Sequence, residues 1–128
     1  MKTLTEDTIM SDNHTQTVAV FDDDKSICKT VQLLVEQQGM VCVSANTIPQ
    51  AAYEIGRSEP DIIIADFEFQ CGFNLALLAE SLAASKAQVF ILTAGDPKDI
   101  LKKYPDLAFA KFVKKGTNLH EVIEEISA

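Results

Sequence analysis

The stretch DIIIAD, residues 61–66, decides the fold, because its apolar residues run without a break between two aspartates. A strand with one face in water alternates apolar and polar residues, whereas an unbroken apolar run is typical of a strand covered on both faces. Such strands occur in parallel sheets that lie between two layers of helices. The run therefore predicts a central parallel strand, and Asp66 stands at its carboxyl end.

Four further apolar runs and five helical patterns extend outward from this strand. The predicted strands are 17–21, 40–43, 61–66, 89–92 and 109–113, and helical spacing of apolar residues predicts helices over 26–38, 47–55, 73–84, 97–104 and 118–127. We expect Thr47 to cap one helix, Gly39 to end another, and Pro105 to stop or bend a third. The strand–helix order, repeated five times, predicts an α/β fold with a doubly wound five-stranded parallel sheet and helices on both faces.

Composition excludes several classes of protein. The chain is 47% hydrophobic and 23% charged, as is typical of a globular domain, and we expect one domain over 17–128 after a flexible polar tail over 1–16. With 11 basic and 19 acidic residues, the net charge of −8 disfavours direct nucleic-acid binding. No apolar run approaches the roughly 20 residues of a membrane span. Three cysteines without metal-binding spacing indicate reduced thiols in a cytoplasmic protein.

Chemically active side chains follow four of the five predicted strands. Asp22 and Asp23 follow the first strand, Asp66 ends the third, Thr93 follows the fourth and Lys115 follows the fifth. Ligands of open parallel sheets bind at the carboxyl ends of the strands, where these side chains would meet. Taken singly, each has an ordinary structural explanation, such as capping a helix or starting a loop. Their joint placement predicts a site, because converging carboxylates need a cation to hold them together.

These segments, in this order, resemble the receiver domain of bacterial two-component response regulators (CheY-like), from about residue 18 to residue 127. The matching pieces are VAVFDDD at 18–24, IIIAD at 62–66, VFILTA at 89–94 and FVKK at 112–115. The resemblance implies a flavodoxin-like fold and a phosphoprotein of a phosphorelay signalling system. Such a domain is not an enzyme acting on other substrates, since it catalyses only its own phosphorylation and dephosphorylation.

The resemblance implies a role for each residue of the predicted site. Asp66 would accept a phosphoryl group from a histidine kinase or a histidine phosphotransfer protein. Magnesium (Mg²⁺) would be held by Asp22, Asp23, Asp66 and the backbone carbonyl of Glu68, oxygen ligands that suit this hard cation. Transfer to Asp66 would then depend on positioning and electrostatics.

Three further residues complete the implied switch. Lys115 would contact the phosphate, and the Thr93 hydroxyl would bond a phosphoryl oxygen. Thr93 would move inward and leave space for the aromatic ring of Phe112. That movement would alter the face formed by the helix over 97–104, the strand over 109–113 and the helix over 118–127, and would relay the signal to a downstream protein target. The resemblance also allows a homodimer through this face.

The sequence departs from the family pattern in two places. Gly116 stands where the family has a proline, and because a cis bond before glycine costs about 2.5–4 kcal/mol, we expect a trans bond or a displaced loop. The loop after Asp66 lacks the usual Met-Pro and reaches its glycine early, at Gly72. Within it, Glu68 adds a fourth carboxylate, which would either bond a metal-bound water or point outward.

Three other functions fit the same fold less well. A phosphatase of the haloacid dehalogenase type needs a second aspartate two residues after the first, where this chain has Glu68. A flavin or dinucleotide module needs a glycine-rich loop after the first strand, where Asp22 and Asp23 would repel a phosphate. A phosphorylation-independent pseudo-receiver, acting only as a protein-interaction module, is the alternative that keeps the whole fold.

Overall fold

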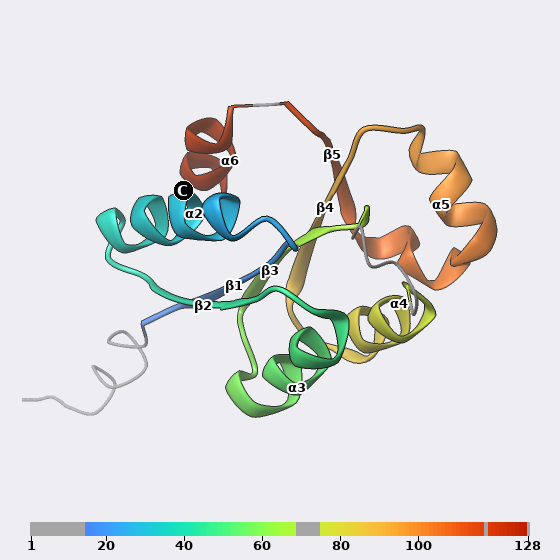
Figure 1. Ribbon diagram of the computed structural model, residues 1–128, viewed down its shortest axis with the longest axis horizontal. Coiled ribbons are helices and arrows are strands. Elements are labelled where there is room, and N and C mark those ends of the chain that lie inside the picture. The colour runs from blue at the N-terminus through green and yellow to red at the C-terminus, as the bar shows by residue number, and fades with distance from the viewer. Residues whose placement is uncertain (1–14, 69–74, 117, 128) are drawn as a thin grey trace, which may run out of the picture.

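A five-stranded parallel sheet forms the centre of the molecule (Figure 1). The computed structural model describes residues 15–68, 75–116 and 118–127. The strands are β1 (Thr17–Phe21), β2 (Val41–Ala45), β3 (Ile62–Asp66), β4 (Gln88–Thr93) and β5 (Lys111–Lys114). Their order in the sheet is β2-β1-β3-β4-β5, and every neighbouring pair is parallel. This topology confirms the predicted fold class.

Helices cover both faces of the sheet (Figure 1). They are α2 (Lys25–Gln37), α3 (Ile48–Ser58), α4 (Leu75–Ala84), α5 (Pro97–Lys103) and α6 (Leu119–Ser127), together with the 3₁₀ helix η1 (Pro105–Phe109). Helices α2 and α6 pack on one face, and α3, α4 and α5 pack on the other. Each face has its own apolar cluster, so the sheet lies between two cores.

Strand β3 is buried along its whole length, as the unbroken apolar run predicts. Successive side chains of a strand point to opposite faces, and those of β3 enter the two cores in turn. Ile63 and Ala65 join the cluster of α3 and α4, whereas Ile62 and Ile64 join the cluster of α2 and α6. The strand is therefore fixed from both sides, which positions Asp66 at its end.

Short turns at the carboxyl edge connect the strands to the following helices. Asp24 caps α2 by accepting the Ser26 N–H at 2.9 Å, and Thr47 caps α3, as predicted, by accepting the Gln50 N–H at 3.3 Å. Asp24 therefore limits the length of the loop that carries Asp22 and Asp23. At the opposite edge of the sheet, Gly39 follows α2 with a φ of +81°, a left-handed conformation that glycine adopts without a steric penalty.

The strand predicted over 109–113 is wrong at its start. Pro105 ends α5 as expected, but the chain then forms η1, which contains Phe109, and β5 begins only at Lys111. The Leu107 N–H bonds the Tyr104 carbonyl at 3.0 Å, and the Ala110 N–H bonds the Leu107 carbonyl at 3.0 Å. Because these turns use Phe109, its side chain is 52% exposed and does not enter the sheet.

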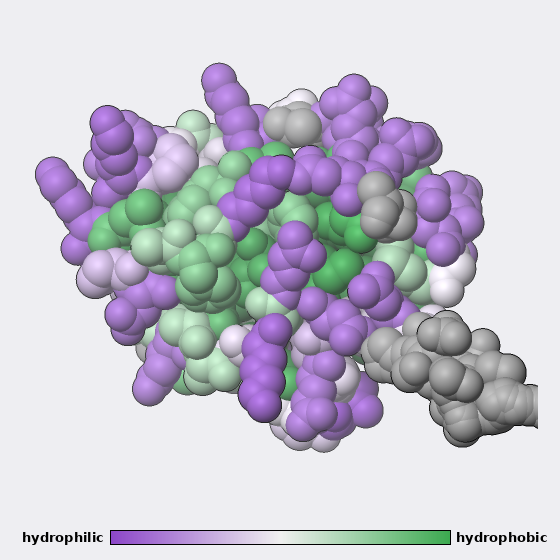
Figure 2. Space-filling view, turned by 180° about the vertical axis from the view of Figure 1, so that it is seen from behind, coloured by the Kyte–Doolittle hydropathy of each residue, from purple (hydrophilic) through white to green (hydrophobic). Residues whose placement is uncertain are grey.

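Hydrophilic side chains project around the rim and across the middle of the face opposite to that of Figure 1, with apolar surface between them (Figure 2). Among the described residues, no helix is long and apolar enough to cross a membrane. The tail predicted over 1–16 falls mostly outside the described residues, and so does most of the loop predicted after Asp66. The domain limits of 17–128 stay a prediction.

Candidate functional site

All five predicted site residues lie at one edge of the sheet. Asp22 and Asp23 follow β1, Asp66 ends β3, Thr93 ends β4, and Lys115 follows β5. Because the strands are parallel, their carboxyl ends share this edge. A cleft of about 440 Å³ opens there, and its lining residues are Asp22, Asp23, Asp24, Ile27, Asp66, Glu68 and Lys115.

Three carboxylates gather at one side of the cleft. Asp22, Asp23 and Asp66 each contribute one carboxylate oxygen to a group in which all three atoms lie within 4.8 Å of one another. Asp66 is 1% exposed and Asp22 is 4% exposed. Like charges this close and this poorly solvated repel one another unless a proton or a cation offsets them. The oxygen ligands fit Mg²⁺, which binds carboxylates and keeps several of its waters.

Burial and the neighbouring carboxylates both disfavour the charged form of Asp22. Burial, the largest effect, raises its pKa from 3.8 to about 6, and the charges of Asp66 and Asp23 act in the same direction. A hydrogen bond from the Asp24 N–H, 2.9 Å long, and the charge of Lys115 oppose the rise. A positive charge near these carboxylates would therefore favour the charged form of Asp22.

Lys115 lies against the other side of Asp66. Its Nζ atom is 3.1 Å from Asp66 Oδ1 and 3.3 Å from Glu68 Oε1. Burial is the largest single influence on the pKa of Lys115 and lowers it, but the hydrogen bonds and charges of Asp66 and Glu68 together outweigh burial and raise that pKa. The backbone N–H of Lys115 also donates a hydrogen bond to the Thr93 carbonyl at 2.9 Å, and this bond connects the end of β5 to β4.

The Asp66 carboxylate is held in place by two donors. Its Oδ1 atom accepts the Glu68 N–H at 2.9 Å in addition to its contact with Lys115. The next residue, Phe67, donates its N–H to the Leu92 carbonyl at 3.1 Å. These bonds fix the direction in which the chain leaves β3, so the Asp66 side chain faces the cleft.

Glu68 reaches across the cleft to the ends of β4 and β5. Its Oε2 atom accepts the Ala94 N–H at 2.8 Å and the Thr93 hydroxyl at 3.2 Å, while Oε1 accepts from Lys115. The Ala94 hydrogen bond is the largest effect on the pKa of Glu68 and holds it below its ordinary value. Of the two predicted alternatives, the outward direction is wrong because these donors hold the side chain, and the bond to a metal-bound water is not tested.

The two predicted switch residues lie on adjacent strands. Thr93 is 4% exposed, and its Oγ1 atom accepts the Gly95 N–H at 3.1 Å. Phe112 is half-buried in β5 and packs against the cluster of α3, α4 and α5. No peptide bond is cis among the described residues, so the bond before Gly116 is trans, as expected. The role of the Glu68 carbonyl as a metal ligand stays a prediction.

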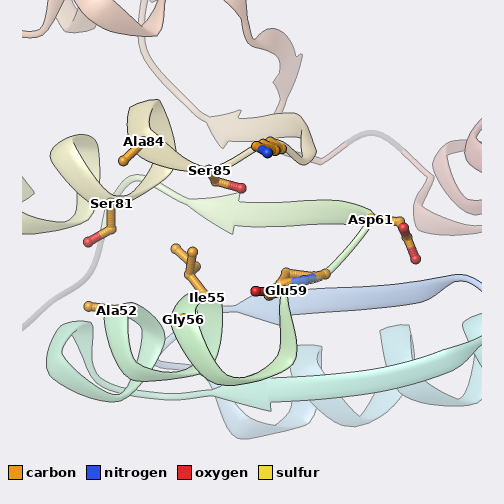
Figure 3. A pocket seen from close by; sticks show the side chains of 10 residues that line it. Ala52, Ile55, Gly56, Glu59, Asp61, Ser81, Ala84 and Ser85 are labelled. Atoms are coloured by element: carbon orange, nitrogen blue, oxygen red, sulfur yellow. The ribbon is translucent and has the colours of Figure 1, made fainter.

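A larger hollow of about 630 Å³ lies between α3 and α4, away from these residues (Figure 3). Asp61, which lines it, precedes β3, whereas Asp66 ends that strand. The length of the strand therefore separates the hollow from the acidic cleft. Small and charged side chains line the hollow, and these lining residues include no cluster of three carboxylates beside a lysine like that of the cleft.

The fold and the cleft together define a class of protein. The chain is a doubly wound α/β domain with three carboxylates and a lysine at the carboxyl edge of its sheet. The family model for the response regulator receiver domain matches residues 18–127. The chain therefore belongs to the receiver domain family of two-component response regulators. No curated protein matches its sequence.

Solved receiver structures have the same fold. The signal receiver domain of a putative Luxo repressor protein from Vibrio parahaemolyticus is 18% identical, with a TM-score of 0.73, and the match covers 89% of this chain and 88% of that chain. A CheY-like receiver from Methanospirillum hungatei JF-1 is 16% identical, with a TM-score of 0.75 and coverage of 88% and 91%. The receiver of the Francisella response regulator 1452 is 23% identical, with a TM-score of 0.70 and coverage of 88% and 93%.

Proposed function

We propose that this receiver accepts a phosphoryl group on Asp66 from a histidine kinase or a histidine phosphotransfer protein and relays the signal by a change of conformation. One observation carries the proposal: the buried Asp66 carboxylate lies in a group of three carboxylates on one side and 3.1 Å from Lys115 Nζ on the other. An acceptor needs its own charge and that of the incoming phosphoryl group to be offset; Lys115 supplies one positive charge, and a cation bound by the three carboxylates would supply the rest.

Asp22, Asp23 and Asp66, with the Glu68 carbonyl, are the residues that would hold Mg²⁺. When bound, the ion would supply positive charge against the carboxylates and the phosphoryl oxygens. The raised pKa of Asp22, caused chiefly by burial, supports a cation-dependent site, because a nearby cation would favour the charged carboxylate.

The protein side chains position the transfer. An Asp66 oxygen attacks phosphorus in line as the bond from phosphorus to the donor imidazole nitrogen breaks, and the bonding electrons leave with the imidazole. Lys115 steadies Asp66 and offsets charge on the new phosphate. The Thr93 hydroxyl and the Ala94 N–H face the cleft as donors for phosphoryl oxygens, since both already bond a carboxylate there.

The signal would leave the site through Thr93 and Phe112. Both lie on the strands beside α5 and α6, so a change at Thr93 would alter the surface formed by α5, β5 and α6. A downstream protein target, or a second copy of the chain, would dock on that surface.

We further propose a cytoplasmic protein whose receiver spans 17–128. The arrangement of Asp23, Asp66 and Lys115 does not favour a phosphorylation-independent role.

Intact mass spectrometry tests the proposal directly. The protein is incubated with Mg²⁺ and acetyl phosphate or phosphoramidate, and we expect the mass of one phosphoryl group to be added. Asp66→Asn should abolish the adduct because the nucleophilic carboxylate is gone, whereas Asp106→Asn, at an exposed aspartate of η1, should leave it unchanged. Chelation of Mg²⁺ should also abolish it. Absence of an adduct on the unaltered protein, in conditions that label another receiver, would overturn the proposal.

A further inference from the structure

The Glu68 carboxylate accepts hydrogen bonds from two strand ends that lie far from it in sequence. It bonds the Ala94 N–H at 2.8 Å and the Thr93 hydroxyl at 3.2 Å at the end of β4. It also contacts Lys115 Nζ, at 3.3 Å, after β5. The Glu68 side chain is 37% exposed, but its carboxylate has one backbone donor, one hydroxyl donor and one ammonium partner, so most of its acceptor capacity is used within the protein.

The donors that hold Glu68 are the donors that the proposed function assigns to the phosphoryl group. A phosphoryl group on Asp66 would need the Thr93 hydroxyl, the Ala94 N–H and Lys115 for its oxygens. Each of the three already bonds a negatively charged oxygen. The Ala94 N–H has a single hydrogen to donate, so it cannot bond Glu68 and a phosphoryl oxygen equally well at the same time.

The start of the loop after Asp66 directs this contact. The Glu68 N–H bonds Asp66 Oδ1 at 2.9 Å, and the Phe67 N–H bonds the Leu92 carbonyl at 3.1 Å. These two bonds tie the backbone of Glu68 to the acceptor and to β4. A side chain that leaves this anchored backbone has a short path to the end of β4, which explains why the carboxylate reaches donors there.

We propose that the Glu68 carboxylate is an internal ligand that competes with tetrahedral oxyanions, including the phosphoryl group, for Thr93, Ala94 and Lys115. The inference rests on the proposed function for the identity of that oxyanion. Before transfer, Glu68 holds the Thr93 hydroxyl toward the cleft and adds negative charge beside Asp66. Transfer to Asp66 must displace the Glu68 carboxylate from the Ala94 N–H and the Thr93 hydroxyl, each of which has one hydrogen to donate, and this slows phosphorylation.

Removing the carboxylate should open the donor site. Glu68→Ala should be labelled by acetyl phosphate about tenfold faster than the unaltered protein, a ratio that corresponds to about 1.4 kcal/mol and to one hydrogen bond with a charged group. Glu68→Gln keeps an acceptor for the Ala94 N–H but loses the charge, so its rate should lie between the two. Glu80→Ala removes an exposed glutamate of α4 and is the matched control for net charge, with an expected rate within twofold of the unaltered protein.

A second measurement needs no phosphorylation. Inorganic phosphate is added while amide signals are followed by ¹⁵N NMR, with thermal melting used to confirm that each variant is folded. The Ala94 and Gly95 amides of Glu68→Ala should respond to phosphate at concentrations that leave the unaltered protein and Glu80→Ala unchanged. The Ala94 amide should also exchange faster with solvent in Glu68→Ala, because its acceptor is gone.

Each outcome decides a separate question. An equal response of Ala94 to phosphate in the unaltered protein and in Glu68→Ala overturns the inference. Where both proteins are labelled, a rate for Glu68→Ala that is no faster than that of the unaltered protein also overturns it. If neither protein is labelled but Glu68→Ala alone responds to phosphate, then Asp66 is not an acceptor and the proposed function fails. The competition by Glu68 for an oxyanion is then supported on its own.

Discussion

Replacing Asp22 by Asn should stabilise the metal-free protein near neutral pH. Asp22 is 4% exposed and shares the cleft with Asp23 and Asp66. Burial chiefly raises its pKa from 3.8 to about 6, so its charged form is disfavoured in the folded state. An asparagine has nearly the same size and keeps an oxygen that can accept the Asp24 N–H, now bonded at 2.9 Å. The substitution therefore removes the charge with little change in packing.

The size of the effect follows from proton linkage. Since the folded-state pKa is above the unfolded one, the folded protein binds more protons between pH 3.8 and about 6, and its stability falls as the pH rises through that window. At about 1.4 kcal/mol per pH unit, charging Asp22 costs about 3 kcal/mol above pH 6. Asp22→Asn should be more stable by about that amount at pH 7.5, and the advantage should vanish below pH 4.

Urea unfolding followed by far-ultraviolet circular dichroism, in the presence of a chelator, measures this difference. Comparing the two proteins at each pH cancels the titration of the other carboxylates. Without the chelator, magnesium at ten times its dissociation constant for the unaltered protein should stabilise that protein by about 1.4 kcal/mol and the variant by less. A variant that is less stable at pH 7.5, or a difference that does not change with pH, would refute the reasoning.

Two further predictions concern the framework that positions the site. Leu82 of α4 is fully buried in the core between that helix and the sheet. Leu82→Ala should therefore lower the free energy of unfolding, measured in urea, by about 2–5 kcal/mol, and a loss under 1 kcal/mol would contradict the packing. Gly39 has a φ of +81° and open space where a Cβ atom would stand, so Gly39→Ala should lower the free energy of unfolding by about 1 kcal/mol through backbone strain alone. An unchanged midpoint of urea unfolding would contradict this expectation.

The core of the fold was predictable because burial leaves a direct record in the sequence. The apolar run that ends at Asp66 has no polar residue because both of its faces are covered, and β3 is indeed buried throughout. The meeting of Asp22, Thr93 and Lys115 then followed from one rule, that parallel strands end at a shared edge. Neither inference required knowledge of the order of the strands, which the sequence pattern did not specify.

The start of the last strand was predicted wrongly because a short apolar segment suits both a strand and a 3₁₀ helix. The run from Phe109 to Val113 is apolar enough for a strand, but Pro105 starts a 3₁₀ helix that continues to Phe109. A short apolar run cannot show whether its first residue completes a turn or begins a strand. In the folded chain the Ala110 N–H bonds the Leu107 carbonyl, so Phe109 belongs to the 3₁₀ helix and stays half exposed, and β5 is short.

The direction of Glu68 was beyond sequence reasoning for a different reason. Its partners Thr93 and Lys115 lie 25 and 47 residues away, so no local pattern encodes the contact. A fourth carboxylate near the site was predictable from its position after Asp66. Whether Glu68 turns toward the carboxylates of Asp22 and Asp23 or toward the donors of Thr93 and Lys115 depends on where the neighbouring strands end. Those positions are known only once the sheet has folded.

The strand order explains why the Glu68 carboxylate turns toward the hydrogen-bond donors rather than toward the other carboxylates. Strand β3 lies between β1 and β4, and β5 lies beyond β4. Asp66 therefore has carboxylates on the β1 side and the donors of Thr93, Ala94 and Lys115 on the β4 side. A cation is favoured on the first side and an oxyanion on the second. Glu68 is an anion attached two residues after Asp66, so electrostatics directs it to the second side, where the phosphoryl group would also have to bind.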